Sequence, residues 1–417
     1  MSVISALRNR AGRAALLISA ALLLSGCGTE ESGSVSLPQQ ESVSFPEQTT
    51  PESTTAAATE SAEVPAESEP QEQPAFSSAT IVCAGDNLIH SPIYNQAKAR
   101  STDGGYDFGY AYENVAPLIE EADLAVLNQE TIISDEFAPS NYPSFCTPSE
   151  MAEEMVKIGF DAVSLSNNHC LDKGEKGLAS TLNFWRENYP EIPVYGAYLS
   201  EEDMNDIRTL EVNGITFAFL GYMEHTNMLS LPKDSECRLT YLSDEERMER
   251  QIKRASEIAD CVIVSVHFGI EVTNTVSEQQ YYFAQKFADW GADIIIGTQP
   301  HTIQTMEYLD TADGGRAFVF YCLGNFISAM DNPYSMVEML GRITVTKDNA
   351  TGEITLSGAE AVPLINHYDS GYRNVRVYPF SDYTAELAAS HGCAGTSMEF
   401  FKRVIEENIP EEYRAEK

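Results

Sequence analysis

The sequence predicts an α/β fold with a mostly parallel sheet, and three observations support this. From about residue 77 onwards, short apolar runs of strand length alternate with helical patterns, which is typical of successive β-α units. The 417 residues are 43% hydrophobic and 10% aromatic, which is enough for a large buried core. Polar side chains directly follow several of the apolar runs, as they do at the ligand-binding edge of an open α/β sheet.

The charge balance excludes one broad class of function. Lys and Arg total 26 against 63 Asp and Glu, so the formal net charge is -37. A general nucleic-acid binder needs a basic surface that displaces counterions, and a broad surface for anionic lipid needs the same. We therefore expect no nucleic-acid partner, whereas a local cationic site, including a bound metal ion, is compatible with this charge.

Residues 1–27 predict the signal peptide of a bacterial lipoprotein. Three arginines within the first 13 residues precede an apolar run from Ala14 to Leu24, which is shorter than the roughly 20 residues of a membrane-spanning helix. The run ends in Leu24-Ser25-Gly26-Cys27, which resembles a lipobox. Lipidation of Cys27 would anchor the protein to the outer face of the cell membrane. The alternative is an ordinary signal peptide with an incidental cysteine.

The rest of the chain divides by composition into a linker, a main domain and a C-terminal part. Residues 28–76 are rich in Glu, Ser, Thr and Pro and contain no Lys or Arg. Such a segment buries too little apolar surface to offset its ordering entropy, so we expect a disordered acidic linker. The main domain is expected over 77–335, and a hairpin and helices over 336–417 are expected to complete it.

The strands and helices of the globular part are expected from apolar runs and helical spacing. The expected strands are Thr80–Ala84, Leu124–Leu127, Ala162–Leu165, Val194–Tyr195, Phe217–Leu220, Val262–Val266, Ile294–Ile296 and Phe318–Leu323. The expected helices contain Val115 to Ala122, contain Met151 to Ile158, begin after Ser243, and span Ser277–Trp290. Alternation near Arg342–Glu360 around Asn349-Ala350-Thr351-Gly352 predicts a hairpin, and the last 35 or so residues have a polar helical pattern. Cys83, Cys261 and Cys322 lie in apolar runs and are expected to be buried.

Six of the expected strands are followed at once by polar side chains. These side chains are Asp86, Asn128 and Glu130, the run Asn167, Asn168 and His169 with Asp172, His267 with Glu271, Gln299 with His301, and Asn325. Each residue alone has a structural explanation as a helix cap, a turn residue or a surface histidine. Together they place two or more carboxylates in one cleft, which costs several kcal/mol unless a cation neutralises them. The pattern therefore predicts a divalent metal with carboxylate, amide and imidazole ligands.

The same segments carry a family resemblance. The segments are Gly85-Asp86, Asn128-x-Glu130, Asn167-Asn168-His169-x-x-Asp172, His267-x-Gly269-x-Glu271, Pro300-His301 and Leu323-Gly324-Asn325-Phe326. In this order they resemble the CapA family of bacterial poly-γ-glutamate capsule synthesis proteins, which is related in fold to the calcineurin-like metallophosphoesterases. The resemblance covers about Ala79–Ser328. It implies a four-layer α/β/β/α sandwich with a small C-terminal extension and with the site at the strand ends.

The resemblance also implies a role for each residue of the site. The implied metal ligands, for one or two Mn, Zn or Fe ions, are Asp86, Glu130, Asn168, His267 and His301. His169 would assist the leaving group with help from Asp172. The other residues expected to line the site are His90, Asn128, Asn167, Glu271, Gln299 and Asn325. Gln299 departs from the His-x-His ending of the phosphoesterase relatives, which puts the second metal in doubt, and His90 stands where many relatives have Arg.

Two functions follow from the resemblance, and the sequence leaves both open. The first is a non-catalytic role in capsule polymer synthesis or export, in which the protein binds an anionic envelope polymer or supports its membrane synthase. The second is a metal-dependent hydrolase that acts on an envelope polymer or phosphoester. Both place the protein outside the cytoplasm, on the lipid anchor at Cys27. A plain solute-binding lipoprotein would not explain the Asn-Asn-His run.

Overall fold

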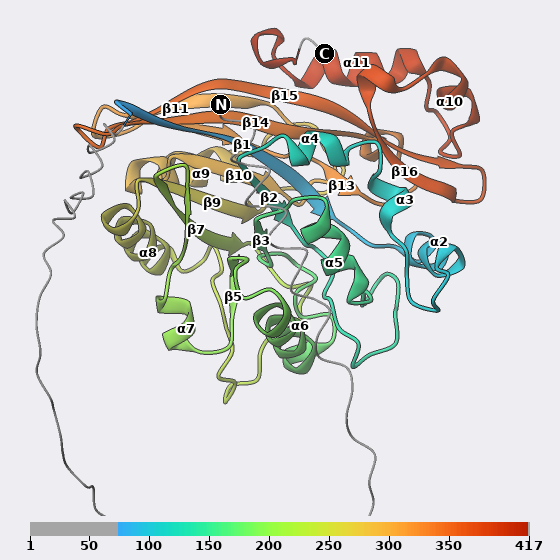
Figure 1. The fold of residues 1–417 in the computed structure, drawn as a ribbon, viewed down its shortest axis with the longest axis horizontal. Helices are drawn as coiled ribbons and strands as arrows, with labels where there is room; N and C mark the ends of the chain where they lie inside the picture. Colours follow the sequence, from blue (N-terminus) through green and yellow to red (C-terminus); the bar gives the residue numbers. More distant parts are fainter. Residues whose placement is uncertain (1–73, 416–417) are drawn as a thin grey trace, which may run out of the picture. The chain divides into compact units, whose positions relative to one another are not determined.

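A computed structural model describes residues 74–415, which contain two large β-sheets and the helices around them (Figure 1). The predicted signal peptide, Cys27 and most of the predicted linker lie outside the described residues. Strand β1 begins at Phe76, so the predicted start of the domain at residue 77 falls one residue inside this strand. Within the described residues, every helix is too short or too polar to cross a lipid bilayer.

The first sheet has eight strands in the order β16-β15-β14-β1-β2-β3-β4, and β13 pairs with the end of β1. Strands β1 to β4 and the β1-β13 pair are parallel, whereas β14, β15 and β16 are antiparallel to their neighbours. The strands are β1 (Phe76–Asn87), β2 (Leu124–Asn128), β3 (Ala162–Ser164), β4 (Val194–Tyr195), β13 (Asn325–Ile327), β14 (Val337–Asp348), β15 (Ile354–Asp369) and β16 (Arg373–Pro379). The segment after residue 335 therefore supplies three strands of this sheet, of which β16 was not predicted.

The second sheet has six strands in the order β11-β12-β10-β9-β7-β6. Its four central strands are parallel, and an antiparallel strand lies at each edge. The strands are β6 (Arg208–Val212), β7 (Ile215–Met223), β9 (Cys261–His267), β10 (Ile294–Thr298), β11 (Met306–Asp310) and β12 (Arg316–Phe320). The short strands β5 (Ala197–Tyr198) and β8 (Arg238–Leu239) form a separate pair.

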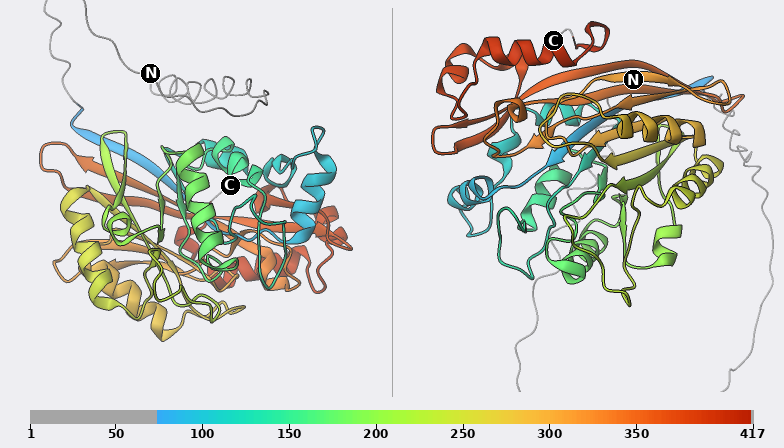
Figure 2. Two further views of the ribbon diagram at one scale, coloured as in Figure 1. Left: turned by 90° about the horizontal axis from the view of Figure 1, so that it is seen from below. Right: turned by 180° about the vertical axis from the view of Figure 1, so that it is seen from behind.

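Alternating side chains on the second sheet separate two layers of core. Phe217 and Phe219 of β7 pack into the core shared with the first sheet, whereas Ala218 and Leu220 pack under helices α8 and α9. This alternation follows from the two-residue period of a strand. On the other side of the molecule, α11 covers the face of β14 that is turned away from the second sheet (Figures 1 and 2). The predicted four-layer α/β/β/α sandwich is confirmed.

The predicted helices are found at the expected places in the chain, but their lengths differ from the predicted ones. The helices of the structure are α2 (Ser91–Arg100), α3 (Gly109–Tyr112), α4 (Ala116–Glu120), α5 (Glu150–Lys157), α6 (Gly174–Asn188), α7 (Glu201–Asn205), α8 (Glu245–Ile258), α9 (Glu278–Trp290), α10 (Ala385–Ser390) and α11 (Met398–Asn408). The cap of α8 is Asp244, whose side chain accepts a hydrogen bond from the backbone N–H of Arg247. The predicted burial of the cysteines is confirmed, and all seven cysteines within 74–415 are free and buried.

The predicted strand Phe318–Leu323 is divided between the two sheets. Strand β12 ends at Phe320 in the second sheet, and the chain then crosses to the first sheet as β13. The crossing turns at Gly324, whose φ of 76° lies in the left-handed region that glycine adopts without strain. This crossing brings Asn325 into register with Asp86, which a single continuous strand would not do.

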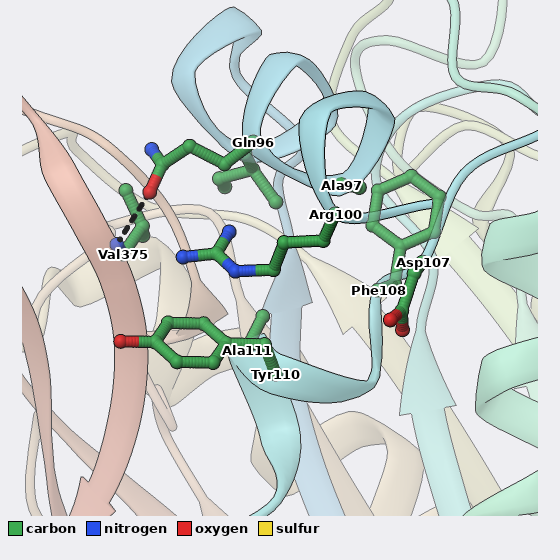
Figure 3. Close-up of a pocket in the computed structure, with 9 residues that line it drawn as sticks. Gln96, Ala97, Arg100, Asp107, Phe108, Tyr110, Ala111 and Val375 are labelled. Atoms are coloured by element: carbon green, nitrogen blue, oxygen red, sulfur yellow. Dashed lines mark hydrogen bonds between the residues drawn. The ribbon is translucent and has the colours of Figure 1, made fainter. Parts of the chain in front are cut away.

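Helices α2 and α3 are tied to β16 around a small cleft that is separate from the polar strand ends (Figure 3). The side-chain oxygen of Gln96 accepts a hydrogen bond from the backbone N–H of Val375 at 3.3 Å. The guanidinium groups of Arg100 and Arg376 both lie against the ring of Tyr110, with their carbons 3.7 and 3.6 Å from its centroid. These contacts attach the C-terminal strand to the N-terminal helices.

Candidate metal centre

Three strands of the first sheet bring Asp86 together with two amide side chains. Asp86 and Asn128 are register partners on the parallel strands β1 and β2, and the Nδ2 of Asn128 donates to Asp86 Oδ1 at 2.6 Å. On the other side of β1, Asn325 of β13 is the register partner of Asp86. All three side chains are buried. Parallel pairing alone places them at one edge of the sheet.

The second sheet contributes two imidazoles of the site. His267 ends β9, and its Nδ1 lies 2.8 Å from the hydroxyl of Thr298 and 3.6 Å from Asp86 Oδ1. The Nδ1 of His301 lies 3.2 Å from Asp86 Oδ2, which also accepts the backbone N–H of Gln299. Gln299 and His301 both have positive φ values, 99° and 54°, so the loop after β10 is held in an unfavourable conformation. The site therefore lies where the edges of the two sheets meet.

Glu130 occupies the centre of this arrangement without a hydrogen-bond partner. Its Oε1 lies 3.6 Å from His267 Nε2 and 3.8 Å from His301 Nε2. Both carboxylate oxygens are buried and form no hydrogen bond with any described residue, and the same is true of the side-chain oxygen of Gln299. Buried polar atoms are normally paired, so three unpaired oxygens in one site require an explanation.

A bound cation would satisfy these oxygens. One possible ligand atom from each of Asp86, Glu130 and His301 lies within 4.8 Å of the other two. Two carboxylates and an imidazole, with amide oxygens beside them, form a donor set that suits Mn, Fe or Zn ions. The residues present therefore fit a divalent cation, which would neutralise charges that are otherwise costly to bury.

The acid–base properties of the site reflect the same crowding of charge. Burial, and then the charge of Asp86, raise the pKa of Glu130 well above its ordinary value. Burial opposes ionisation of Asp86, but His267 and His301 lower the pKa of its carboxyl group. Burial would lower the pKa of His301, but Glu130 and Asp86 raise it to about 10, whereas burial lowers the pKa of His267 to about 3. In the absence of a cation, the raised pKa of His301 favours an imidazolium beside these carboxylates, which takes over part of the neutralising role of the ion.

The Asn-Asn-His run lies beside this cluster. Asn168 Oδ1 is 3.1 Å from His267 Nε2, so these two predicted ligands are in contact. The side chain of Asn167 instead forms hydrogen bonds with the backbone of neighbouring segments. Its Nδ2 donates to the backbone oxygen of Gln129 at 2.9 Å, and its Oδ1 accepts the backbone N–H of His169. Asn167 therefore holds the run against the end of β2.

His169 and Asp172 form a buried pair with a defined orientation. The Nδ1 of His169 lies 2.8 Å from Asp172 Oδ2, and this oxygen also accepts the backbone N–H of Phe145 at 2.6 Å. The ring of Phe145 packs edge-to-face against His169 at a centroid distance of 4.8 Å. The Nε2 of His169 has no hydrogen-bond partner among the described residues. This nitrogen is available to exchange a proton with a ligand.

The two remaining predicted residues lie at the margin. His90 is nearly buried, its Nδ1 lies 3.2 Å from the backbone nitrogen of Ala329, and burial lowers the pKa of this histidine to about 4. A neutral His90 does not replace the positive charge of an arginine at this position. Glu271 is exposed, and its Oε1 accepts a hydrogen bond from Nε2 of Gln299 at 3.3 Å. The structure thus brings all the predicted residues within 74–415 to one region, while their individual roles stay predictions.

Thr298 and Glu338 are among the site residues that were missed in the sequence. Thr298 contacts His267, and Glu338 of β14 is buried and contacts Asn325. A signal for Glu338 was present, because it is the single charged residue within the apolar run Met336–Leu340. Charged side chains are rarely fully buried unless they have a partner, so a lone carboxylate in such a run indicates a specific contact.

Comparison with known proteins decides the family. Residues 80–330 match the protein family described as "Bacterial capsule synthesis protein PGA_cap", and this match spans more than half of the chain. The chain belongs to this family. The predicted resemblance to CapA proteins is thereby confirmed, and the matched range contains every predicted site residue within the described part of the chain.

Two curated relatives carry the CapA name. The chain is 27% identical over 260 residues to the "Capsule biosynthesis protein CapA" of Bacillus anthracis, covering 60% of this chain and 59% of the relative. It is 28% identical over 223 residues to the "PGA biosynthesis protein CapA" of Bacillus subtilis strain 168, covering 52% and 56%. The chain thus matches less than two thirds of the length of either relative.

Solved structures with a similar course of the chain include two enzymes. A phosphatase of Mycoplasma pneumoniae is 13% identical, with a TM-score of 0.44 and coverage of 70% of this chain and 94% of that chain. The NAD nucleotidase of Haemophilus influenzae is 14% identical, with a TM-score of 0.43 and coverage of 80% and 60%.

Proposed function

We propose that this PGA_cap protein acts in the synthesis or export of a capsule polymer of the poly-γ-glutamate type, at the outer face of the cell membrane. The observation that carries the proposal is the convergence of Asp86, Glu130 and His301 from two sheets, with both oxygens of Glu130 unpaired. The names of the two CapA relatives support the process. The lipobox-like sequence at Cys27 supports a lipid anchor and an extracytoplasmic location.

The site is proposed to hold one divalent cation, Mn, Zn or Fe. Asp86, Glu130 and His301 would hold the ion, and His267 and Asn168 stand next to them. Gln299 supplies a neutral oxygen where relatives have an imidazole, which weakens any second site. When bound, such an ion supplies a Lewis acid and lowers the pKa of a coordinated water. It also supplies positive charge to a chain whose net charge of -37 repels an anionic polymer.

In the first form of the proposal the protein is an accessory that binds the anionic polymer or supports its membrane synthase. The cation site is then a local attachment point for carboxylate or phosphate groups on an acidic protein. In this form the buried pair His169 and Asp172 orients a ligand by hydrogen bonding, without turnover. Binding of a polyanion would then depend on the cation and would weaken when a chelator is added.

A second form is a metal-dependent hydrolase, and one observation favours it. Asp172 Oδ2 contacts Nδ1 of His169 and accepts a hydrogen bond from the backbone N–H of Phe145. Nε2 of His169 has no hydrogen-bond partner among the described residues. A histidine oriented in this way is suited to donate a proton to the leaving oxygen of a phosphoester. The carboxylate keeps the ring in one orientation, so the proton is presented at a defined position.

Metal content and turnover separate the two forms. Elemental analysis of the purified protein is expected to show about one equivalent of metal, which Asp86→Asn removes. A generic phosphodiester is then assayed with the wild type, with His169→Ala, and with His225→Ala as the control, because His225 is an exposed histidine on a neighbouring loop. Turnover lost only in His169→Ala supports the hydrolase. Bound metal without turnover, together with loss of capsule polymer in cells carrying Asp86→Asn, supports the accessory role, and a metal-free wild type would refute the cation site.

A further inference from the structure

Glu338 is a buried carboxylate without a Lys or Arg partner among the described residues. It lies on β14, beyond residue 330 where the family match ends, and its side chain is 0% exposed. Within residues 74–415, no Lys or Arg side chain forms an ion pair with it. A fully buried carboxylate without a basic partner is costly, so its hydrogen bonds must be specific.

Both oxygens of Glu338 bind the same residue. Its Oε2 accepts the backbone N–H of Asn325 at 2.6 Å, and its Oε1 accepts the side-chain Nδ2 of Asn325 at 3.2 Å. The backbone N–H can only donate, so Oε2 accepts from it, and in its ionised form the carboxyl group offers Oε1 as an acceptor as well. The amide of Asn325 must therefore turn its nitrogen towards Glu338 and its oxygen in the opposite direction.

The oxygen of Asn325 then decides which ring nitrogen of His301 faces the centre of the site. Asn325 Oδ1 lies 3.0 Å from His301 Nδ1, and Asp86 Oδ2 lies 3.2 Å from the same nitrogen. Because both neighbours are acceptors, Nδ1 carries a proton. The other nitrogen, Nε2, points towards Glu130, with 3.8 Å between it and Oε1. Nε2 is therefore the nitrogen left to bind a cation.

The backbone around Asn325 leaves no room for another arrangement. A Cβ atom added at Gly324 would lie 1.9 Å from Glu338 Oε2, so the glycine of the Leu-Gly-Asn-Phe segment makes space for this carboxylate. The backbone N–H of Met339 donates to the oxygen of Leu323 at 3.0 Å, which holds β14 against the segment that leads into β13. The space at Gly324 and the backbone bond from Met339 thus fix Glu338 relative to Asn325.

We propose that Glu338 is a positioning residue of the cation site, which acts through Asn325 to hold His301 with its Nδ1 proton turned inwards and its Nε2 turned towards Glu130. This inference rests on the proposed function, because the orientation of His301 matters for binding a cation at this site. It extends the site beyond the matched family range and makes β14, in the C-terminal part of the chain, a component of the site.

The first test follows the Nδ1 proton of His301 by nitrogen-edited NMR of the metal-free protein. A ring N–H that donates to Asn325 is expected as a downfield, exchange-protected proton in the wild type, assigned by its absence in His301→Gln. In Glu338→Gln, an amide with its own donor faces Asn325, so this resonance is expected to disappear or move upfield. The matched control is Glu154→Gln, a mostly buried glutamate of α5 that pairs with Lys157. An unchanged resonance in Glu338→Gln would overturn the proposal.

The second test measures Zn and Mn dissociation constants in a double-mutant cycle. Glu338→Gln is expected to weaken metal binding about 10- to 100-fold, as the loss of an outer partner of a ligand does elsewhere. Asn325→Ala is expected to weaken it at least as much, and adding Glu338→Gln to Asn325→Ala should change little more. Independent, additive losses would overturn the proposed relay. If the wild type binds no metal, the proposed cation site fails, while the NMR experiment still decides the role of Glu338.

Discussion

Replacement of Glu130 by Gln tests the central feature of the site, a buried carboxylate that has no partner without a cation. The substitution keeps the shape of the side chain and removes its charge. In the metal-free protein, Glu130 is buried among the other carboxylates of the site, and both of its oxygens are unpaired. We therefore expect the variant to be more stable than the wild type when a chelator is present.

The size of the effect follows from the pKa of Glu130, which burial and then Asp86 raise well above 4.5. Each unit by which the folded-state pKa exceeds the unfolded-state value costs about 1.4 kcal/mol at a pH above both, so at pH 7 the cost stays below about 3 kcal/mol. The attraction between Glu130 and His301 offsets part of this cost, because the charge of Glu130 raises the pKa of His301. A net stabilisation of about 1 to 2 kcal/mol is the expected result at pH 7.

Urea denaturation followed by circular dichroism measures this difference, first with a chelator and then with metal. At a metal concentration of about 100 times the dissociation constant, the wild type should gain about 2.7 kcal/mol, whereas Glu130→Gln should gain almost nothing. The order of the two stabilities then reverses. Glu154→Gln is the matched control, and it should lose a little stability under both conditions because its Lys157 partner is left unpaired. A variant that is less stable than the wild type with chelator, and that metal still stabilises, would refute the reasoning.

Three further predictions follow from the same site. In urea titrations, the stability of the metal-free protein should fall as the pH rises from 6.5 to 9, at up to about 1.4 kcal/mol per unit, because the pKa of His301 is raised to about 10 in the folded state and a group of this kind stabilises below its unfolded pKa of 6.5. The raised pKa of Glu130 gives a slope of the same sign. The double variant Glu130→Gln/His301→Gln should therefore flatten the slope, and a slope that persists in it would contradict the assignment. Gln299→His should raise metal affinity in calorimetric titrations, because an imidazole would replace the unpaired amide oxygen; unchanged affinity and stoichiometry would count against Gln299 as a ligand. Gly324→Ala should lower the free energy of unfolding by at least about 2 kcal/mol in urea denaturation. Gly352→Ala has a similar φ of 79° but open space around its added Cβ, so it should lower the free energy of unfolding by about 1 kcal/mol. Equal losses of stability would show that Glu338 yields to the added methyl group.

Much of the candidate site could be predicted because its residues follow buried strands directly. The carboxyl ends of parallel strands share an edge, so an apolar run ending in Asp86 and another ending in Asn128 indicate neighbours before any coordinates are known. The strand pattern also located His267 and the Asn-Asn-His run. The pattern did not show that Asp86 belongs to one sheet and His267 to another, because both follow apolar runs of the same length.

The sequence by itself determined the α/β class, the order of most strands along the chain and the chemical kinds of side chain at their ends, because these depend on local periodicity. Only the tertiary structure decided which of these ends meet. The division of Phe318–Leu323 between two sheets, the contact of Gln299 with Asp86 across 213 residues, and the arrival of Glu338 beside Asn325 are such decisions. The physical reason is that strand pairing and buried hydrogen bonds join distant segments through complementary surfaces, and the local pattern of a segment specifies its face but not its partner.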